Sequence, residues 1–338
     1  MMFKKKGFVL AIACVLILSF LAGCSQGGQP AQEEPEEQAQ QPEEIDFPTK
    51  PLELIVAFSA GGPTDVPARI LAKYWEEELG QPIVVVNKPG AQGQIGHAET
   101  AQAKPDGYTL GFLNVPILNL TGKRSGIYDP SSFDYIGCNI IDVGAIMVPK
   151  GSKYTTLEEL LEDAKARPGE VLLTCNGPAT DDYLGLLEMQ DAAGVEFGYV
   201  PQTDDAGTIT AIMGGHADVG LANLSNYVAH QADVVVLALL SDERSVKFPD
   251  IPTFEEITGK KATYASARGL GAPKGLPDEV LAKLRETFAK AAQNPDLIAD
   301  FDQIGFDEIY WTGEEFEAYT VELENSIDKW EEKLGLDS

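Results

Sequence analysis

The chain has 338 residues, with 53 acidic and 25 basic side chains and a formal net charge of −28 at pH 7. A field of this sign argues against nucleic acid and anionic lipid headgroups as partners. It also repels any anionic ligand unless local hydrogen-bond donors capture it. The length suits a body of two ordinary domains.

Residues 1–23 have the pattern of a bacterial lipoprotein signal peptide. Three lysines at positions 4–6 precede an apolar run over 7–20, and Leu21-Ala22-Gly23 places small residues before Cys24. The apolar run is shorter than the roughly 20 residues that a membrane-spanning helix needs. We therefore expect cleavage before Cys24, lipidation of Cys24, and an extracytoplasmic protein anchored to a membrane at the cell surface or in the periplasm. An ordinary cleaved signal and a short anchor helix are the alternatives.

Residues 24–46 are rich in Gln, Glu and Pro and contain almost no large apolar side chain. Such a segment buries too little surface to offset its conformational entropy, and its like charges keep it extended. The composition predicts a disordered acidic tether that holds a folded body, beginning near Phe47, away from the lipid surface. A tail with a partner of its own is the alternative.

The first part of the body alternates apolar runs with amphipathic segments. We predict strands over 52–58, 83–86 and 108–113, a helix over 65–79, and a short helix ending near 102. The apolar face of the longer helix consists of Val66, Ile70, Leu71, Tyr74, Trp75 and Leu79. Thr64 is placed to cap this helix and Gly80 to end it. The order is a β-α-β-α-β unit, which is typical of an open, doubly wound sheet.

The second part of the body continues the alternation. Thr156 and Glu159 have the spacing of a capping box, and they predict a helix through residue 166. Further helices are predicted to end at Gly194 and at Gly214. The remaining predicted strands cover 171–175, 196–200, 217–221, 234–240 and 306–310, and the remaining helices cover 277–292 and 312–334. The pattern predicts two α/β lobes, which would form a clamshell if they face each other.

Two glycine-rich loops follow the first two predicted strands, over residues 60–65 and 90–96. Glycine lets backbone N–H groups approach a ligand closely, and a helix start adds N–H donors and a positive dipole end. Because parallel strands place both loops at one sheet edge, together they predict a nest for one anionic group, built from amides rather than charged side chains. Neither loop is a Walker or GxGxxG motif, so a nucleotide is not indicated. Tight packing is the alternative reading of such glycines.

Six ordered segments resemble the substrate-binding receptors of tripartite tricarboxylate transporters, the Bug family. The segments are FSAGGPTD at 58–65, NKPGAQGQIG at 87–96, PDGYTL at 105–110, VP at 200–201, GGHADV at 214–219 and FPDIPT at 248–253. The resemblance covers most of the body. It implies an α/β, two-lobed Venus-flytrap protein that delivers a small carboxylate to membrane permease subunits. It also implies that each lobe is an open mixed sheet flanked by helices, with the first lobe over 47–147 and 264–338 and the second over 148–263.

The resemblance and the loop positions together predict the ligand-binding residues. They are Phe58, Ala60, Gly61, Gly62, Thr64, Asp65, Gly90, Ala91, Gln92, Gly93, Gln94, Asn114, Asn176, Thr180, Asp181, Gln202, Asp204 and Asn223. In the family the two glycine-rich loops hold a ligand carboxylate through backbone amides and bound water.

The second lobe departs from the family pattern in its charges. The usual Val-Pro-Tyr-Lys is Val-Pro-Gln-Thr at 200–203, and Asp204 and Asp205 follow it, while Asp181 and Asp182 stand at another predicted helix start. This site has lost a basic residue and gained acids, so an amino-carboxylate or a metal-chelated carboxylate fits better than a free polycarboxylate. Plain helix capping is the alternative for Asp181 and Asp204.

Catalytic signatures are lacking in this sequence. The three histidines lie in unrelated segments, and no GxSxG, HExxH or Cys/His metal spacing occurs, so we expect no enzyme, cofactor or resident metal. His97 is predicted to be a surface residue, with a position in the cleft as the alternative. Cys138 and Cys175 are predicted to be buried free thiols, with a disulfide between them as the alternative. We expect a monomer. A sensor input domain or an enzyme on the same fold is the alternative function, since the fold alone does not decide.

Overall fold

The computed structural model describes residues 46–178 and 180–336, and these residues form one compact unit. The predicted signal peptide, Cys24 and all but the end of the predicted acidic tether lie outside the described residues. Within the described ranges, every helix is too short or too polar to cross a bilayer.

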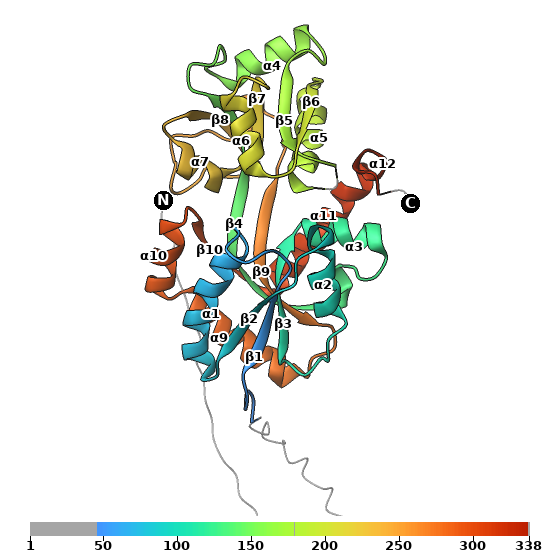
Figure 1. The fold of residues 1–338 in the computed structure, drawn as a ribbon, viewed down its shortest axis with the longest axis vertical. Helices are drawn as coiled ribbons and strands as arrows, with labels where there is room; N and C mark the ends of the chain where they lie inside the picture. Colours follow the sequence, from blue (N-terminus) through green and yellow to red (C-terminus); the bar gives the residue numbers. More distant parts are fainter. Residues whose placement is uncertain (1–45, 179, 337–338) are drawn as a thin grey trace, which may run out of the picture. The chain divides into compact units, whose positions relative to one another are not determined.

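The elements alternate as the sequence predicts through most of the chain (Figure 1). The strands are β1 (Leu52–Val56), β2 (Ile83–Asn87), β3 (Thr109–Val115), β4 (Phe133–Pro149), β5 (Leu172–Asn176), β6 (Gly198–Gln202), β7 (Val219–Asn223), β8 (Val234–Leu240), β9 (Ala265–Pro273) and β10 (Asp307–Thr312). The helices are α1 (Asp65–Leu79), α2 (Gln94–Ala101), α3 (Ile117–Ser125), α4 (Leu157–Ala166), α5 (Asp181–Ala193), α6 (Asp205–Met213), α7 (Leu224–His230), α8 (Phe254–Thr258), α9 (Asp278–Ala292), α10 (Pro295–Gln303), α11 (Gly313–Lys329) and α12 (Glu331–Leu334), with 3₁₀ turns at Ala91–Gly93 and Pro130–Ser132.

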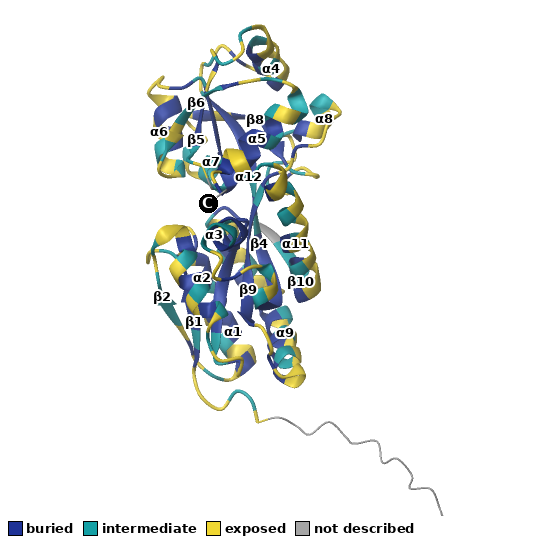
Figure 2. Cartoon of the chain, turned by 90° about the vertical axis from the view of Figure 1, so that its right-hand side faces the viewer, coloured by how far each residue is buried: buried dark blue, intermediate teal, exposed yellow. Residues whose placement is uncertain are grey.

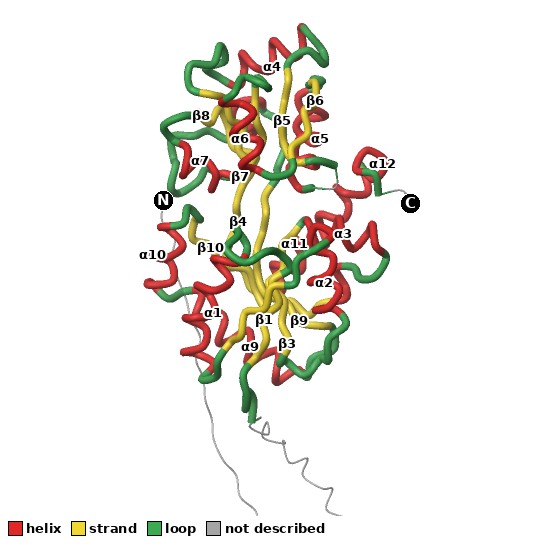
Figure 3. Tube along the Cα trace, viewed as in Figure 1, coloured by secondary structure: helices red, strands yellow, loops and turns green. Residues whose placement is uncertain are grey.

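Two mixed sheets share the long strand β4 (Figure 3). In the first, β1 pairs in parallel with β2 and β3, and β9 runs antiparallel between β3 and β4. In the second, β5 pairs in parallel with β6 and β7, while β4 runs antiparallel to β7 and β8. We call these sheets with their helices the first and the second lobe. Pairing of β4 changes from β9 to β7 and β8 at Val143–Gly144, and the residue boundaries predicted for the lobes stay a prediction.

Helices cover both faces of each sheet (Figure 2). In the first lobe α1, α9 and α10 pack on one face, and α2, α3 and α11 on the other. Trp75 of α1 is fully buried there, and its indole N–H donates to Thr287 of α9 at 3.0 Å. Gly80 ends α1 in the left-handed conformation, as predicted. Val66, predicted on the apolar face, is instead exposed, because the buried stripe runs through Ala68 and Leu71.

Several boundaries and elements differ from the sequence prediction. Strand β4 was not predicted, because glycines interrupt its apolar pattern. They are required there, since a Cβ at Gly137 or Gly144 would overlap the ring of Phe288 or Tyr264. Strand β9 and helices α3, α7, α8 and α10 were also missed. The single helix predicted over 312–334 is divided into α11 and α12 at Trp330, whose backbone leaves the helical region.

Candidate ligand-binding site

The first glycine-rich loop is built around the buried carboxylate of Asp65. It accepts hydrogen bonds from the amide of Gly61 at 2.8 Å, from Arg69 at 2.9 Å and from Asn87 at 2.8 Å. Burial alone would raise the pKa of Asp65, but these donors, led by Arg69, outweigh it and lower the pKa. Thr64 stands at the N-cap without a side-chain capping bond, so its predicted capping role is wrong. Asp65 therefore fixes the loop from beneath rather than pointing at a ligand.

The second glycine-rich loop contains four consecutive residues with positive φ. The values are +138° at Gly90, +47° at Ala91, +57° at Gln92 and +93° at Gly93. Left-handed backbone at two successive non-glycine residues stores strain, and such strain concentrates at ligand sites. The side chain of Gln92 accepts a hydrogen bond from Arg124 at 2.8 Å, and Gln94 begins α2.

Some of the predicted amide donors are used within the loops. The amide of Gly61 donates to Asp65, and that of Gly93 donates to the carbonyl of Gly90 at 3.0 Å. Ala60, Ala91 and Gln92 are exposed, whereas Gly62 and Gly90 are half-buried. The first N–H groups of a helical turn have no acceptor inside it, so the amides at the start of the turn are the donors that remain for an anion.

His97 lies beneath the second loop and not on the surface, so its predicted exposure is wrong. Its ring is edge-on to Phe58 and Tyr128, with centroids 6.3 Å and 6.0 Å away. Burial lowers the pKa of His97 to about 3, so the imidazole is neutral at physiological pH. Gly93 is needed above it, because a Cβ there would lie 3.0 Å from Phe58 and 3.3 Å from His97.

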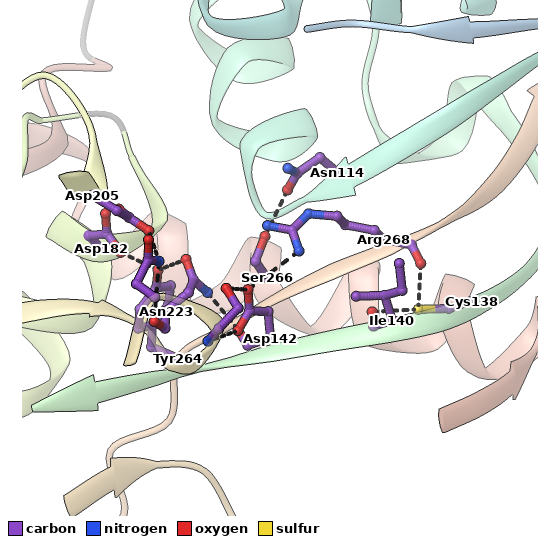
Figure 4. Close-up of polar contacts among 12 residues, drawn as sticks. Asn114, Cys138, Ile140, Asp142, Asp182, Asp205, Asn223, Tyr264, Ser266 and Arg268 are labelled. Carbon is purple, nitrogen blue, oxygen red and sulfur yellow. Dashed lines mark hydrogen bonds and ion pairs between the residues drawn. The ribbon is translucent and has the colours of Figure 1, made fainter. Parts of the chain in front are cut away.

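A buried arginine that the sequence analysis missed stands beside the predicted residue Asn114. Asn114 pairs in register with Arg268 of β9, so both side chains lie on one face of the sheet. Ser266 donates to Asn114 at 3.0 Å, and the Arg268 guanidinium lies between that pair and Asp142 (Figure 4). Arg268 reaches this place because β9 pairs with β3. The two strands are far apart in the chain, since Ser266 and Asn114 are separated by 152 residues.

In the second lobe, the side chain of Asn176 bridges two carboxylates, the buried one of Asp182 and the half-buried one of Asp205. Its amide donates to Asp182 and, at 2.8 Å, to Asp205. We call Asp181, Asp182 and Asp205 the acid cluster. Tyr264 also donates to Asp182. Burial raises the pKa of Asp182 well above its ordinary value, and the charges of Asp205 and Asp181 raise it further.

The remaining predicted residues have local partners. Thr180 caps α5 by accepting from the amide of Tyr183, so capping of α5 falls to Thr180 rather than to the buried Asp181. Asp204 is exposed and caps α6, accepting from Gly207 at 2.8 Å. Asn223 is buried; it donates to the carbonyl of Asp142 at 2.6 Å and accepts from Tyr264 at 3.0 Å. Gln202 pairs in register with Asn176, which places both at the same end of the second sheet.

Cys138 and Cys175 are buried free thiols, as predicted. Burial raises the pKa of the Cys138 thiol to about 12, so it stays protonated and unreactive. Among residues 46–178 and 180–336, no group of three or more His, Cys, Asp or Glu side chains is arranged to hold a metal ion. The acid cluster is therefore not arranged as a metal site.

Asp181 predicts a pH-dependent stability. Burial and the charge of Asp205 raise its pKa from 3.8 to about 6, against a smaller lowering by Arg268. Between pH 3.8 and about 6, Asp181 is therefore protonated more in the native state than in the unfolded state. The contribution of Asp181 to the free energy of unfolding falls as pH rises through this range. We expect Asp181→Asn to raise the free energy of unfolding at pH 7.5 by on the order of 2 kcal/mol, and by little at pH 4. Urea denaturation at both pH values measures this, with Asp204→Asn as the exposed control; equal effects at both pH values would contradict it.

The described fold and these loops match a known family. Residues 67–336 match the family described as tripartite tricarboxylate transporter family receptor. The chain belongs to this receptor family. A relative from Cupriavidus necator, the UPF0065 protein in the gbd 5'region, is 32% identical over 297 residues, covering 86% of this chain and 89% of that protein.

Solved structures agree with this chain in fold. A TctC solute binding protein from Polaromonas, without ligand, has a TM-score of 0.74 at 29% identity and covers 86% of this chain and 98% of its own. An R. palustris protein solved with adipate has a TM-score of 0.70 at 25% identity and covers 86% of this chain and 98% of its own. The two-lobed α/β fold and the family resemblance predicted from the sequence are thereby confirmed.

Proposed function

We propose that this protein is a lipid-anchored, extracytoplasmic receptor that captures a small carboxylate or amino-carboxylate between its lobes and delivers it to the permease subunits of a tripartite tricarboxylate-type transporter. The observation that carries the proposal is the run of positive φ angles over residues 90–93, beside a loop held rigid by Asp65. Backbone of this kind presents amides to an anion without a formal positive charge. Such amides can bind an anion even though the net charge of −28 repels it.

The family supports the transport role, and the adipate bound to one relative supports the carboxylate class. His97 gives no support to an enzyme, because an imidazole with a pKa of about 3, buried under the second loop, is a poor general base at neutral pH. We infer binding and release of an unmodified solute by a monomer without a cofactor.

A thermal-shift screen of the full chain against mono-, di- and amino-carboxylates tests the function. A ligand that binds only the native state stabilises it by about 2.7 kcal/mol at 100 times its Kd, which raises Tm by several degrees. The corresponding alcohols and amides, which lack the carboxylate, are the controls and should leave Tm unchanged. A screen in which no carboxylate shifts Tm at millimolar concentration would contradict the proposal.

The lipid anchor makes a separate prediction. We expect mass spectrometry of the protein from its cells to find an N-terminus at Cys24 carrying acyl groups, because Leu21-Ala22-Gly23-Cys24 is the cleavage and acylation signal. Cys24→Ala should accumulate as an unlipidated precursor, whereas Cys138→Ala should be processed normally. A wild-type N-terminus at another residue, without lipid, would refute the anchor.

A further inference from the structure

Arg268 is a buried cation whose hydrogen bonds are unusually incomplete. The residue is 5% exposed, and its Nε–H has no partner among the described residues. Its ion pair with Asp142 joins Nη1 and a carboxylate oxygen at 3.5 Å, at the long end of the hydrogen-bond range. The guanidinium also lies over the ring of Phe306, 5.2 Å from the centroid, which orients it without satisfying a donor.

A purely structural arginine would be paired better than this. A buried guanidinium normally holds a carboxylate through two parallel N–H bonds, since leaving a buried charge unpaired is costly. Asp142 approaches Arg268 through one nitrogen alone, at 3.5 Å, and its oxygens lie closer to the amide and the hydroxyl of Ser225, at 3.0 Å and 2.6 Å. The unused donor of Arg268 therefore suits an anionic group that is not part of the chain.

The surroundings of Arg268 carry the opposite charge. Its side chain extends from β9 toward the side where Asp182, Asp205 and Asn223 lie (Figure 4), and its charge acts on Asp181. Asn176, which holds two members of the acid cluster, has a buried side-chain oxygen without a hydrogen-bond partner among the described residues. A cationic or N–H-bearing group placed there would find this acceptor beside the carboxyl groups of Asp182 and Asp205, which the amide of Asn176 contacts.

We propose that Arg268 pairs with an anionic group of the bound solute and that Asn176 and the acid cluster bind its cationic group, so that the natural ligand is a small zwitterion of the amino acid type. This assignment rests on the proposed receptor function and narrows its ligand class. A guanidinium with an unused N–H, together with the unpartnered side-chain oxygen of Asn176 at the acid cluster, complements a molecule that carries both charges. A dicarboxylate would satisfy Arg268 but would place its second carboxylate against the acid cluster, where burial increases the repulsion.

Calorimetric titration with matched pairs of probes tests the ligand class. Each pair differs only in the ammonium group: L-aspartate and succinate, L-glutamate and glutarate, 5-aminovalerate and valerate. In the wild type we expect an amino acid to bind at least about 10-fold more tightly than its partner, which corresponds to one charge-assisted hydrogen bond.

Two substitutions should separate the roles within the site. Arg268→Gln should weaken binding of the amino acid by about 10- to 100-fold, and Asp182→Asn should reduce the preference for the amino acid over its ammonium-free partner. Arg167→Gln, in an exposed pair with Asp163, is the matched control and should bind like the wild type. Where Arg268→Gln does not fold, Arg268→Lys keeps the charge but loses the planar fork, and it should weaken binding in the same direction.

The outcomes distinguish the two proposals. If succinate, glutarate or valerate binds as tightly as its amino partner and Arg268→Gln keeps wild-type affinity, the zwitterion assignment is wrong and the carboxylate receptor stands. If the Arg268 and Asp182 variants lose affinity as expected while Arg167→Gln does not, both proposals are supported. If no carboxylate of either class binds, the receptor function fails together with the assignment.

Discussion

Gly93→Val should abolish ligand binding. A valine at this position meets a φ of +93°, which β-branched residues avoid, and its Cβ would lie 3.0 Å from the ring of Phe58 and 3.3 Å from His97. The substitution must therefore straighten the second loop or push both rings away, and either change moves the amides at Ala91 and Gln92. We expect at least a 100-fold loss of affinity for the carboxylate found in the screen, measured by calorimetry.

Two other glycines supply a matched comparison for this result. Gly61 in the first loop has a φ of +77° and Gly80 at the end of α1 a φ of +71°, and a Cβ at either meets no atom within 4 Å. Valine should therefore cost similar stability at both positions, through backbone strain alone. Only Gly61→Val should lose binding. Equal retention of affinity in the Gly93 and Gly61 variants would show that these loops do not hold the ligand.

Asp65→Ala should unfold the first loop locally and destabilise the body. The substitution leaves the amide of Gly61 and one donor of Asn87 without their acceptor, while the loss of the pair with Arg69 adds less because Arg69 is half exposed. We expect a loss of about 2–3 kcal/mol in the free energy of unfolding, measured by urea denaturation, together with weaker ligand binding.

Asp65→Asn is the informative comparison for this residue. It keeps an oxygen that can accept from Gly61 but loses the charge that faces Arg69. We therefore expect Asp65→Asn to retain more than half of the free energy of unfolding that Asp65→Ala loses, and most of the wild-type affinity for the ligand. An alanine variant within 0.5 kcal/mol of the wild type would mean that the hydrogen bonds of Asp65 do not organise the loop.

Local patterns predicted α1 and the two glycine-rich loops because the information lies within a few residues of sequence. The helical spacing of Leu71 and Trp75 sets the buried face of α1, and Gly80 ends it. The same reasoning failed for β4, where the need for glycine at Gly137 and Gly144 comes from aromatic rings that the fold brings from elsewhere in the chain. Long-range contacts of this kind leave no periodic signal.

The candidate site also contains features that the sequence predicted and features that depend on long-range contacts. Asp181 and Asp204 both stand at helix starts, and no sequence pattern separates the buried one from the exposed cap; only their exposure does. Arg268 was missed because β9 was not predicted, so nothing in the sequence placed this isolated arginine inside a sheet. Its neighbours Asn114 and Asp142 come from β3 and β4, so its role follows from the order of strands in the sheet.

The break between α11 and α12 at Trp330 gives the protein a built-in optical probe. The indole N–H donates to Glu188 of α5 at 2.6 Å, and the ammonium groups of Lys329 and Lys333 lie 4.6 Å and 5.0 Å from its ring centroid. The tryptophan thus belongs to the last helices of the chain, while its hydrogen-bond partner belongs to the second lobe. A rotation of one lobe against the other that moves Trp330 relative to Glu188 would change the field around this ring, and we expect a shift in its fluorescence to reveal such a motion without an attached dye.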